Sequence, residues 1–222
     1  MARARRVAGG GTAVEVAPER LAGWFTRFAE RNDGVGTTEL GEHEVRVFAR
    51  NGVTATATVP FGPLAVTGRH EGLAVEPLVA HALVPRLLAL LLVRLGGHSL
   101  GLARGGTVLV SRTDRHLVQG RTAAGGWSQQ RFARRRAGQA RVALRAAAQD
   151  AVEVLVPRLS EVDAVVLGGD RLALGELRAD HRLHPLFARA EARVLDIPEP
   201  RRDVLDDAAG RAISVEVVLS GA

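Results

Sequence analysis

The sequence contains no cysteine, which excludes disulfide bonds, thiolate nucleophiles and cysteine-ligated zinc. A reduced, cytoplasmic location is therefore expected. Aromatic residues make up only 4% of the chain, so the core must be built from valine, leucine and alanine. The most apolar stretch, Leu87 to Val93, is bracketed by arginines and is far too short to span a bilayer. No membrane segment and no signal peptide is predicted.

Lysine is also absent, so all 30 basic residues are arginine and the net charge is +6. Acidic residues are scarce in one region: between Pro77 and Gln149, Asp114 stands alone against twelve arginines. Such a local excess predicts a surface that faces a polyanion, with nucleic acid as the leading candidate. The alternative is a solvated basic face without a partner.

Histidines do not form a convincing metal site. The seven histidines are scattered, and only His181 and His184 are close in sequence. No third ligand follows them at helical spacing, so neither a metal nor another cofactor is expected.

The first third of the chain predicts a small α+β segment. Residues 1–11 are basic and glycine-rich and predict a flexible tail, and residues 12–76 form the α+β lead-in. Pro18 opens an amphipathic helix that runs to about Arg31. Strand patterns follow at Gly36–Leu40, Glu44–Ala49 and Val53–Val59.

Residues 77–222 predict an α/β (α+β) domain with a mixed sheet. Glycine turns separate three apolar strands, and a fourth strand follows a bend, which together indicate an antiparallel meander. Helices and strands then alternate to the end of the chain, so helices should cover the sheet. The predicted strands are Leu87–Leu95, His98–Ala103, Thr107–Ser111, Arg115–Val118, Ala164–Leu167, Ala192–Asp196 and Ala212–Leu219. The predicted helices are 128–156, 171–189 with a break at Pro185, and 201–209.

A glycine-rich loop precedes the long helix. It reads Gly120-Arg121-Thr122-Ala123-Ala124-Gly125-Gly126-Trp127-Ser128-Gln129-Gln130 and is followed by arginines. Ser128 is a good helix N-cap, and helix N-termini attract phosphate through free N–H groups. A plain capping loop remains the alternative, because most Gly-Gly pairs are only turns. No Lys-Ser/Thr pair follows the glycines, which excludes a P-loop.

This run, from Val118 to Arg136, resembles the catalytic loop of bacterial relatives of the archaeo-eukaryotic release factors. The nearest branch is actinobacterial and Vms-like, similar to the peptidyl-tRNA hydrolase of eukaryotic ribosome quality control. The resemblance implies an RNase H-like core and hydrolysis of the ester between nascent peptide and tRNA. It further implies the large ribosomal subunit with its rRNA and peptidyl-tRNA as partners, with no DNA and no membrane.

The resemblance also assigns residues. Release factors carry Gly-Gly-Gln, whereas this branch carries Gly-x-x-Gln, which Gly126-Trp127-Ser128-Gln129 matches. Gln129 is the expected catalytic amide, and the adjacent Gln130 is the alternative. The loop would act through Gly125, Gly126, Ser128, Gln129 and Gln130. RNA phosphates would be bound by Arg121, Arg131, Arg134, Arg135 and Arg136.

Two other functions fit parts of the sequence. A non-catalytic ribosome or tRNA binder would use the same arginines without the glutamines. A nuclease on an RNase H-like fold would need several carboxylates converging on Mg²⁺. The meander offers only Asp114 for this purpose, while Asp163 and Asp170 flank a later strand.

Overall fold

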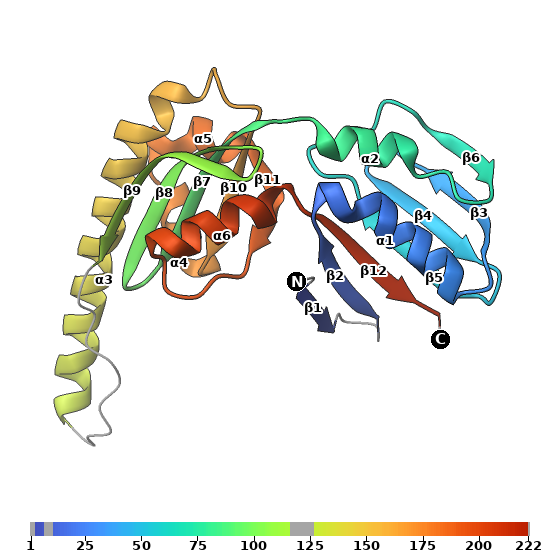
Figure 1. Cartoon of the computed structure of the whole chain (residues 1–222). Coiled ribbons are helices and arrows are strands. Elements are labelled where there is room, and N and C mark those ends of the chain that lie inside the picture. The colour runs from blue at the N-terminus through green and yellow to red at the C-terminus, as the bar shows by residue number, and fades with distance from the viewer. Residues whose placement is uncertain (1–2, 7–10, 116–126, 222) are drawn as a thin grey trace. The chain divides into compact units, whose positions relative to one another are not determined.

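A computed structural model describes residues 3–6, 11–115 and 127–221 of the chain. It divides into two compact units (Figure 1). The first unit contains residues up to Pro85 and returns with Ile213–Ala222, while the second contains Arg86–Ala212. No helix of the described residues is long and apolar enough to cross a membrane.

The first unit is built on a seven-stranded antiparallel sheet. One side of the sheet packs against two helices, α1 (Pro18–Arg31) and α2 (Glu76–Leu83). In spatial order, the strands are β1 (Arg3–Arg6), β2 (Thr12–Val16), β12 (Val215–Ser220), β5 (Thr54–Thr58), β4 (Glu44–Ala49), β3 (Val35–Leu40) and β6 (Gly68–Glu71).

Helix α1 has the bounds that the sequence predicts, because its signals are local. Pro18 occupies the first turn, where its missing N–H costs nothing. Leu21, Phe25 and Phe28 recur at helical spacing and are buried against the sheet. Trp24 stacks on Phe28 with ring centroids 5.8 Å apart and extends this apolar face.

Three features of the first unit differ from expectation. Arg3–Arg6, predicted as part of a flexible tail, forms β1 and pairs with β2. The strand β6 and the helix α2 lack strong local signals and are not predicted. The last strand, β12, was expected in the mixed sheet but lies between β2 and β5. The compact units thus divide the chain at residue 85, whereas the sequence pattern placed the division at residue 76.

The second unit contains a mixed sheet, as predicted, and the sheet has five strands. Strands β7, β8 and β9 form the antiparallel meander, and β10 and β11 add in parallel beside β7. In spatial order, they are β11 (Ala190–Leu195), β10 (Ala164–Gly169), β7 (Leu87–Arg94), β8 (Gly97–Arg104) and β9 (Thr107–Arg115). Strand β9 is continuous to Arg115, so the predicted break at Thr113 is wrong. Its pairing with β8 continues through that point.

The centre of this sheet is buried on both faces. The side chains of Leu88, Leu90, Leu91 and Leu92 in β7 are at most 1% exposed. Full burial of one such side chain stabilises a fold by about 1.5–3 kcal/mol. The continuous apolar run of β7 therefore has the pattern of a central strand covered by helices on both sides.

Helices lie on both faces of the second sheet. They are α3 (Trp127–Val154), α4 (Arg171–Arg178), α5 (His184–Ala188) and α6 (Arg202–Ile213), with 3₁₀ turns η1 (Val156–Arg158) and η2 (His181–Leu183). Arg112 of β9 bonds to α3, while the adjacent Ser111 accepts a hydrogen bond from Arg202 of α6. Successive strand residues point to opposite faces, so α3 and α6 cover opposite sides.

Candidate functional site

The long helix α3 connects the predicted catalytic loop to the sheet. Its 28 residues span about 42 Å at the ordinary helical rise. Its C-terminal half packs on the sheet through Ala143, Leu144, Ala147 and Ala151, all buried. Figure 1 shows the N-terminal half extending beyond the sheet. We call residues 127–142 the arm, and Ala143, which follows them, is the first side chain of α3 that is described as buried.

Charge separates the arm from the anchored half of α3. Between Trp127 and Gln149 the helix has no acidic residue, and its six arginines all lie there. The first acids, Asp150 and Glu153, occur where the helix contacts the sheet. Helix α3 is therefore rich in arginine from Trp127 to Gln149, and its acidic residues are confined to the end that is bonded to the sheet.

A polar cluster fixes that end to the sheet. His98 of β8 is completely buried, and its Nε2 lies 2.8 Å from Asp150 Oδ2. Arg112 Nη1 donates to Asp150 Oδ1 at 2.8 Å and to Glu153 Oε2 at 2.6 Å. Burial alone would raise the pKa of Asp150, but the hydrogen bonds from Arg112 and His98 outweigh it and lower that pKa.

The cluster continues to η2. Glu153 accepts a bond from Gln149 Nε2, and Gln149 Oε1 accepts one from Arg182 Nη1 at 3.0 Å. Arg182 also bonds to Asp180, which caps η2 and has its pKa lowered to about 2, chiefly by the side-chain hydrogen bond from Arg182. Bonds from β8, β9 and η2 thus hold α3 in one register on the sheet.

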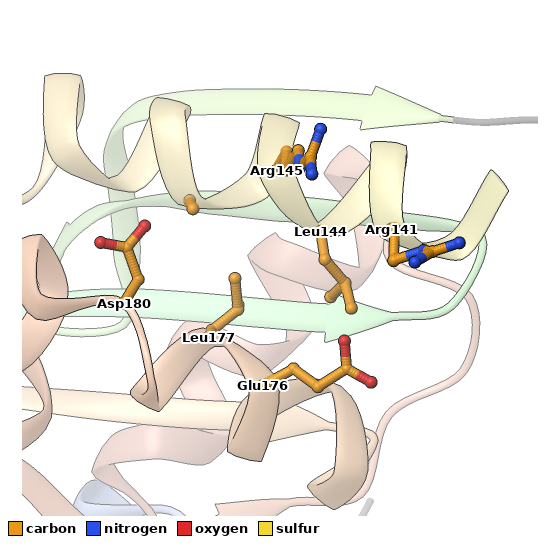
Figure 2. A pocket seen from close by; sticks show the side chains of 7 residues that line it. Arg141, Leu144, Arg145, Glu176, Leu177 and Asp180 are labelled. Atoms are coloured by element: carbon orange, nitrogen blue, oxygen red, sulfur yellow. The ribbon is translucent and has the colours of Figure 1, made fainter. Parts of the chain in front are cut away.

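A groove lies beside the arm, between α3 and α4. Its volume is about 180 Å³. Arg141, Leu144 and Arg145 line it from α3, and Glu176, Leu177 and Asp180 line it from the opposite side (Figure 2). The leucines are buried and form an apolar floor between charged walls.

Most of the predicted catalytic loop lies outside the described residues. This holds for Arg121, Gly125 and Gly126. Ser128, Gln129 and Gln130 lie in the first turn of α3, and Arg131, Arg134, Arg135 and Arg136 follow in the arm. Only the backbone of these seven residues is described. Ser128, expected as the N-cap, lies inside the helix, because α3 begins one residue earlier at Trp127.

The carboxylates that a nuclease would need do not converge. Asp163 precedes β10 and accepts a bond from the Leu87 amide, whereas Asp170 follows β10 and caps α4. The two residues therefore lie at opposite ends of one strand. Asp114 accepts a bond from the Arg115 amide. No group of three metal-ligating side chains occurs in the described ranges, and that includes the surroundings of His181 and His184.

The sequence analysis did not predict two features of this region. The alternation His98, Leu100, Leu102 places the histidine on the same face of β8 as two leucines, and this period of two was the available signal. Arg141 and Arg145 were counted only in the general arginine excess. Their four-residue spacing indicates a shared helix face, but the opposite wall comes from α4, which no local pattern pairs with them.

Comparisons with known proteins bear on this second unit. The family model of the Actinobacteria/chloroflexi VLRF1 release factor matches residues 86–218. No curated protein matches the chain. Solved structures with similarity include the archaeal translation termination factor aRF1, at 16% identity and a TM-score of 0.45, covering 75% of this chain and 48% of that one. Another, titled an archaeal protein, has 15% identity and a TM-score of 0.40, with 73% and 48% covered.

The chain spans about half the length of these solved structures. The family match begins at the first residue of the second unit and contains α3 and the whole mixed sheet. It confirms the resemblance to release factors that the loop sequence indicated. Since the match covers more than half of the chain, this protein belongs to the Actinobacteria/chloroflexi VLRF1 release factor family.

Proposed function

We propose that the protein is a peptidyl-tRNA hydrolase, which cleaves the ester between nascent peptide and tRNA on stalled ribosomes or large subunits. The observation that carries this proposal is the anchored helix α3, which joins the predicted Gly-x-x-Gln segment to the sheet of a VLRF1 release factor family member. The order β11-β10-β7-β8-β9, with helices on both faces, also supports an RNase H-like core.

The proposed chemistry relies on positioning. A glutamine amide is not basic, so Gln129 cannot act as a general base at neutral pH. Its side-chain oxygen can hold a water molecule against the ester carbonyl. Backbone N–H groups of the loop can stabilise the negative charge that develops on the carbonyl oxygen. The tRNA and the rRNA of the large subunit supply the remainder of the site.

The charge of the arm suits a protein segment that must reach that site along a path lined by RNA. The 23 residues Trp127–Gln149 carry positive charge without any acid that RNA phosphates would repel. The cytoplasm, where ribosomes work, is the proposed location, and rescue of stalled ribosomes is the proposed role.

The decisive experiment measures peptide release from stalled large-subunit complexes that carry labelled peptidyl-tRNA. We expect wild type to release peptide and Gln129→Ala to lose about 10²-fold or more in rate, as for removal of one transition-state-orienting group. Gln130→Ala and the double variant establish which amide acts. Gln139→Ala, which removes an amide farther along α3, is the matched control and should retain release.

Co-sedimentation with large subunits separates catalysis from binding. Retained binding by a Gln129→Ala protein that no longer releases peptide supports the hydrolase. Wild type that binds subunits but leaves every nascent chain on its tRNA would identify the non-catalytic binder instead. Cleaved RNA strands that depend on divalent metal would identify a nuclease.

A further inference from the structure

The groove between α3 and α4 contains charged side chains without partners in the described part of the chain. Arg141, Arg145 and Glu176 form no ion pair or hydrogen bond with any described residue, although all three line the groove. The fourth charged residue that lines the groove, Asp180, differs because it is bonded to Arg182. The charges of the groove that have no described partner are therefore two arginines on one wall and one glutamate on the other.

The two arginines repel each other. Arg141 and Arg145 are four residues apart on α3, where like charges lie close and destabilise a helix. An anion placed between their guanidinium groups would remove that repulsion and accept hydrogen bonds from both. A phosphate group has the charge and the oxygens for this role.

The floor and the far wall require more than a phosphate. Leu144 and Leu177 are 6% and 2% exposed, and Figure 2 shows Leu144 pointing from α3 toward α4. Because so little of either leucine is exposed, they close the bottom of the groove and leave a flat group to lie between its charged walls. Beyond them, the Glu176 carboxylate accepts hydrogen bonds and repels anions, so the part of the ligand nearest to it must present N–H donors.

We propose that this groove binds one unstacked nucleotide of the RNA that the arm contacts. The phosphate bridges Arg141 and Arg145, the base lies between the walls above Leu144 and Leu177, and the base edge donates to Glu176. Single-stranded RNA is commonly recognised through splayed bases in this way. The inference rests on the proposed function only in taking RNA as the partner.

Carboxylate chemistry also selects the base. Guanine presents two adjacent donors, N1–H and the N2 amino group, which match the two oxygens of Glu176. Adenine and cytosine each offer one amino group beside an acceptor nitrogen, and uracil offers one N–H between two carbonyls. The groove should therefore prefer guanine.

The test uses the full chain and labelled RNA pentamers in which the central base of an adenine run is guanine, inosine, adenine, cytosine or uracil. Fluorescence anisotropy at low salt gives each affinity. We expect guanine to bind about tenfold more tightly than inosine, which lacks the N2 amino group. Glu176→Gln should abolish this preference, while Glu19→Gln, an exposed change on α1, should preserve it.

The arginines are tested by Arg141→Ala/Arg145→Ala against Arg20→Ala/Arg27→Ala, which removes the same charge from exposed positions on α1. The groove variant should weaken all pentamers and reduce the slope of log affinity against log salt by about 0.7, for the one lost phosphate contact. The α1 variant should change the slope little. Circular dichroism establishes that each variant is folded.

Equal affinity of wild type for all five pentamers, or equal behaviour of the two arginine variants, would overturn the inference. Displacement of RNA by a polyglutamate peptide at lower concentration than by unlabelled RNA would identify an acidic protein segment as the occupant. The pentamer assay contains no ribosome or peptidyl-tRNA, so a wild-type protein that releases peptide but shows no base preference counts against the groove alone. Loss of release with an intact preference counts against the hydrolase alone.

Discussion

His98 Nε2 and Asp150 Oδ2 lie 2.8 Å apart, which joins a completely buried histidine of β8 to the anchored half of α3. The Asp150 carboxylate also accepts a hydrogen bond from Arg112, so this one side chain connects β8 and β9 to α3. Gln129, the predicted catalytic amide, lies 21 residues upstream in the first turn of the same helix. The contacts that fix the orientation of α3 on the sheet therefore lie far from the predicted catalytic residue.

Removal of Asp150 should destabilise the second unit. Asp150→Ala leaves the buried His98 without its acceptor, and such loss costs about 1–3 kcal/mol. Urea denaturation followed by circular dichroism measures the change, and Asp150→Asn, which keeps an acceptor oxygen, should cost less. The control, Glu161→Ala, removes only the exposed pair with Arg158 and should cost about 0–1 kcal/mol. Equal losses in the two alanine variants would contradict the anchoring role.

Two glycines should respond in opposite directions to alanine. Gly169 has φ +104°, and an added Cβ would lie 2.0 Å from the Val93 carbonyl oxygen. Gly169→Ala should therefore lower the free energy of unfolding by at least about 1–3 kcal/mol. Gly175 lies within α4 with open space around it, so Gly175→Ala should raise that free energy by about 0.5–1 kcal/mol. Thermal unfolding of both variants tests the pair, and a stabilised Gly169→Ala protein would refute the close packing of β10 on β7.

Acid should remove the contribution of the Asp180–Arg182 pair. The hydrogen bond from Arg182 holds the pKa of Asp180 at about 2, below its ordinary value of 3.8. A lowered folded-state pKa stabilises the fold at pH values above 3.8, and this stabilisation is lost as the pH falls through about 2. Asp180→Asn lacks the ionised form, so its deficit in urea midpoint should be present near neutral pH and vanish by about pH 2. A deficit that does not change with pH would mean that Asp180 stabilises the fold by capping η2 and not through its charge.

Binding of single-stranded RNA should weaken steeply with salt. Each phosphate contact contributes about 0.7 to the slope of log affinity against log salt. Arg134→Ala/Arg135→Ala should therefore reduce the slope by about 1.4 in filter-binding titrations. A flat salt response of wild type would contradict the proposal that the arginines of the arm bind RNA phosphates.

Local patterns explain which parts of the fold the sequence predicts. Helix α1 and strand β4 agree with their predicted bounds, because capping, periodicity and turn signals act within a few residues. The strand β12 was found as a strand but assigned to the wrong sheet, since its partners β2 and β5 are more than 150 residues away in sequence. Alternation shows which residues form a strand and not which strand they join.

The same limit applies to the candidate site. The glycine and glutamine residues of the loop are adjacent in sequence, so a motif could find them. The groove combines Arg141 of α3 with Glu176 of α4, 35 residues later, and only the packing of the two helices joins them. The His98–Asp150 contact likewise depends on the register of α3 on β8.

The position of β12 has a consequence for synthesis. Residues 215–220 complete the middle of the first sheet, and both of their neighbours, β2 and β5, are translated long before them. The second unit uses only residues between 86 and 212, so its hydrogen-bonding partners are all available earlier. On a translating ribosome, the second unit can therefore fold first. The sheet of the first unit lacks β12 between β2 and β5 until residues 215–220 have been made.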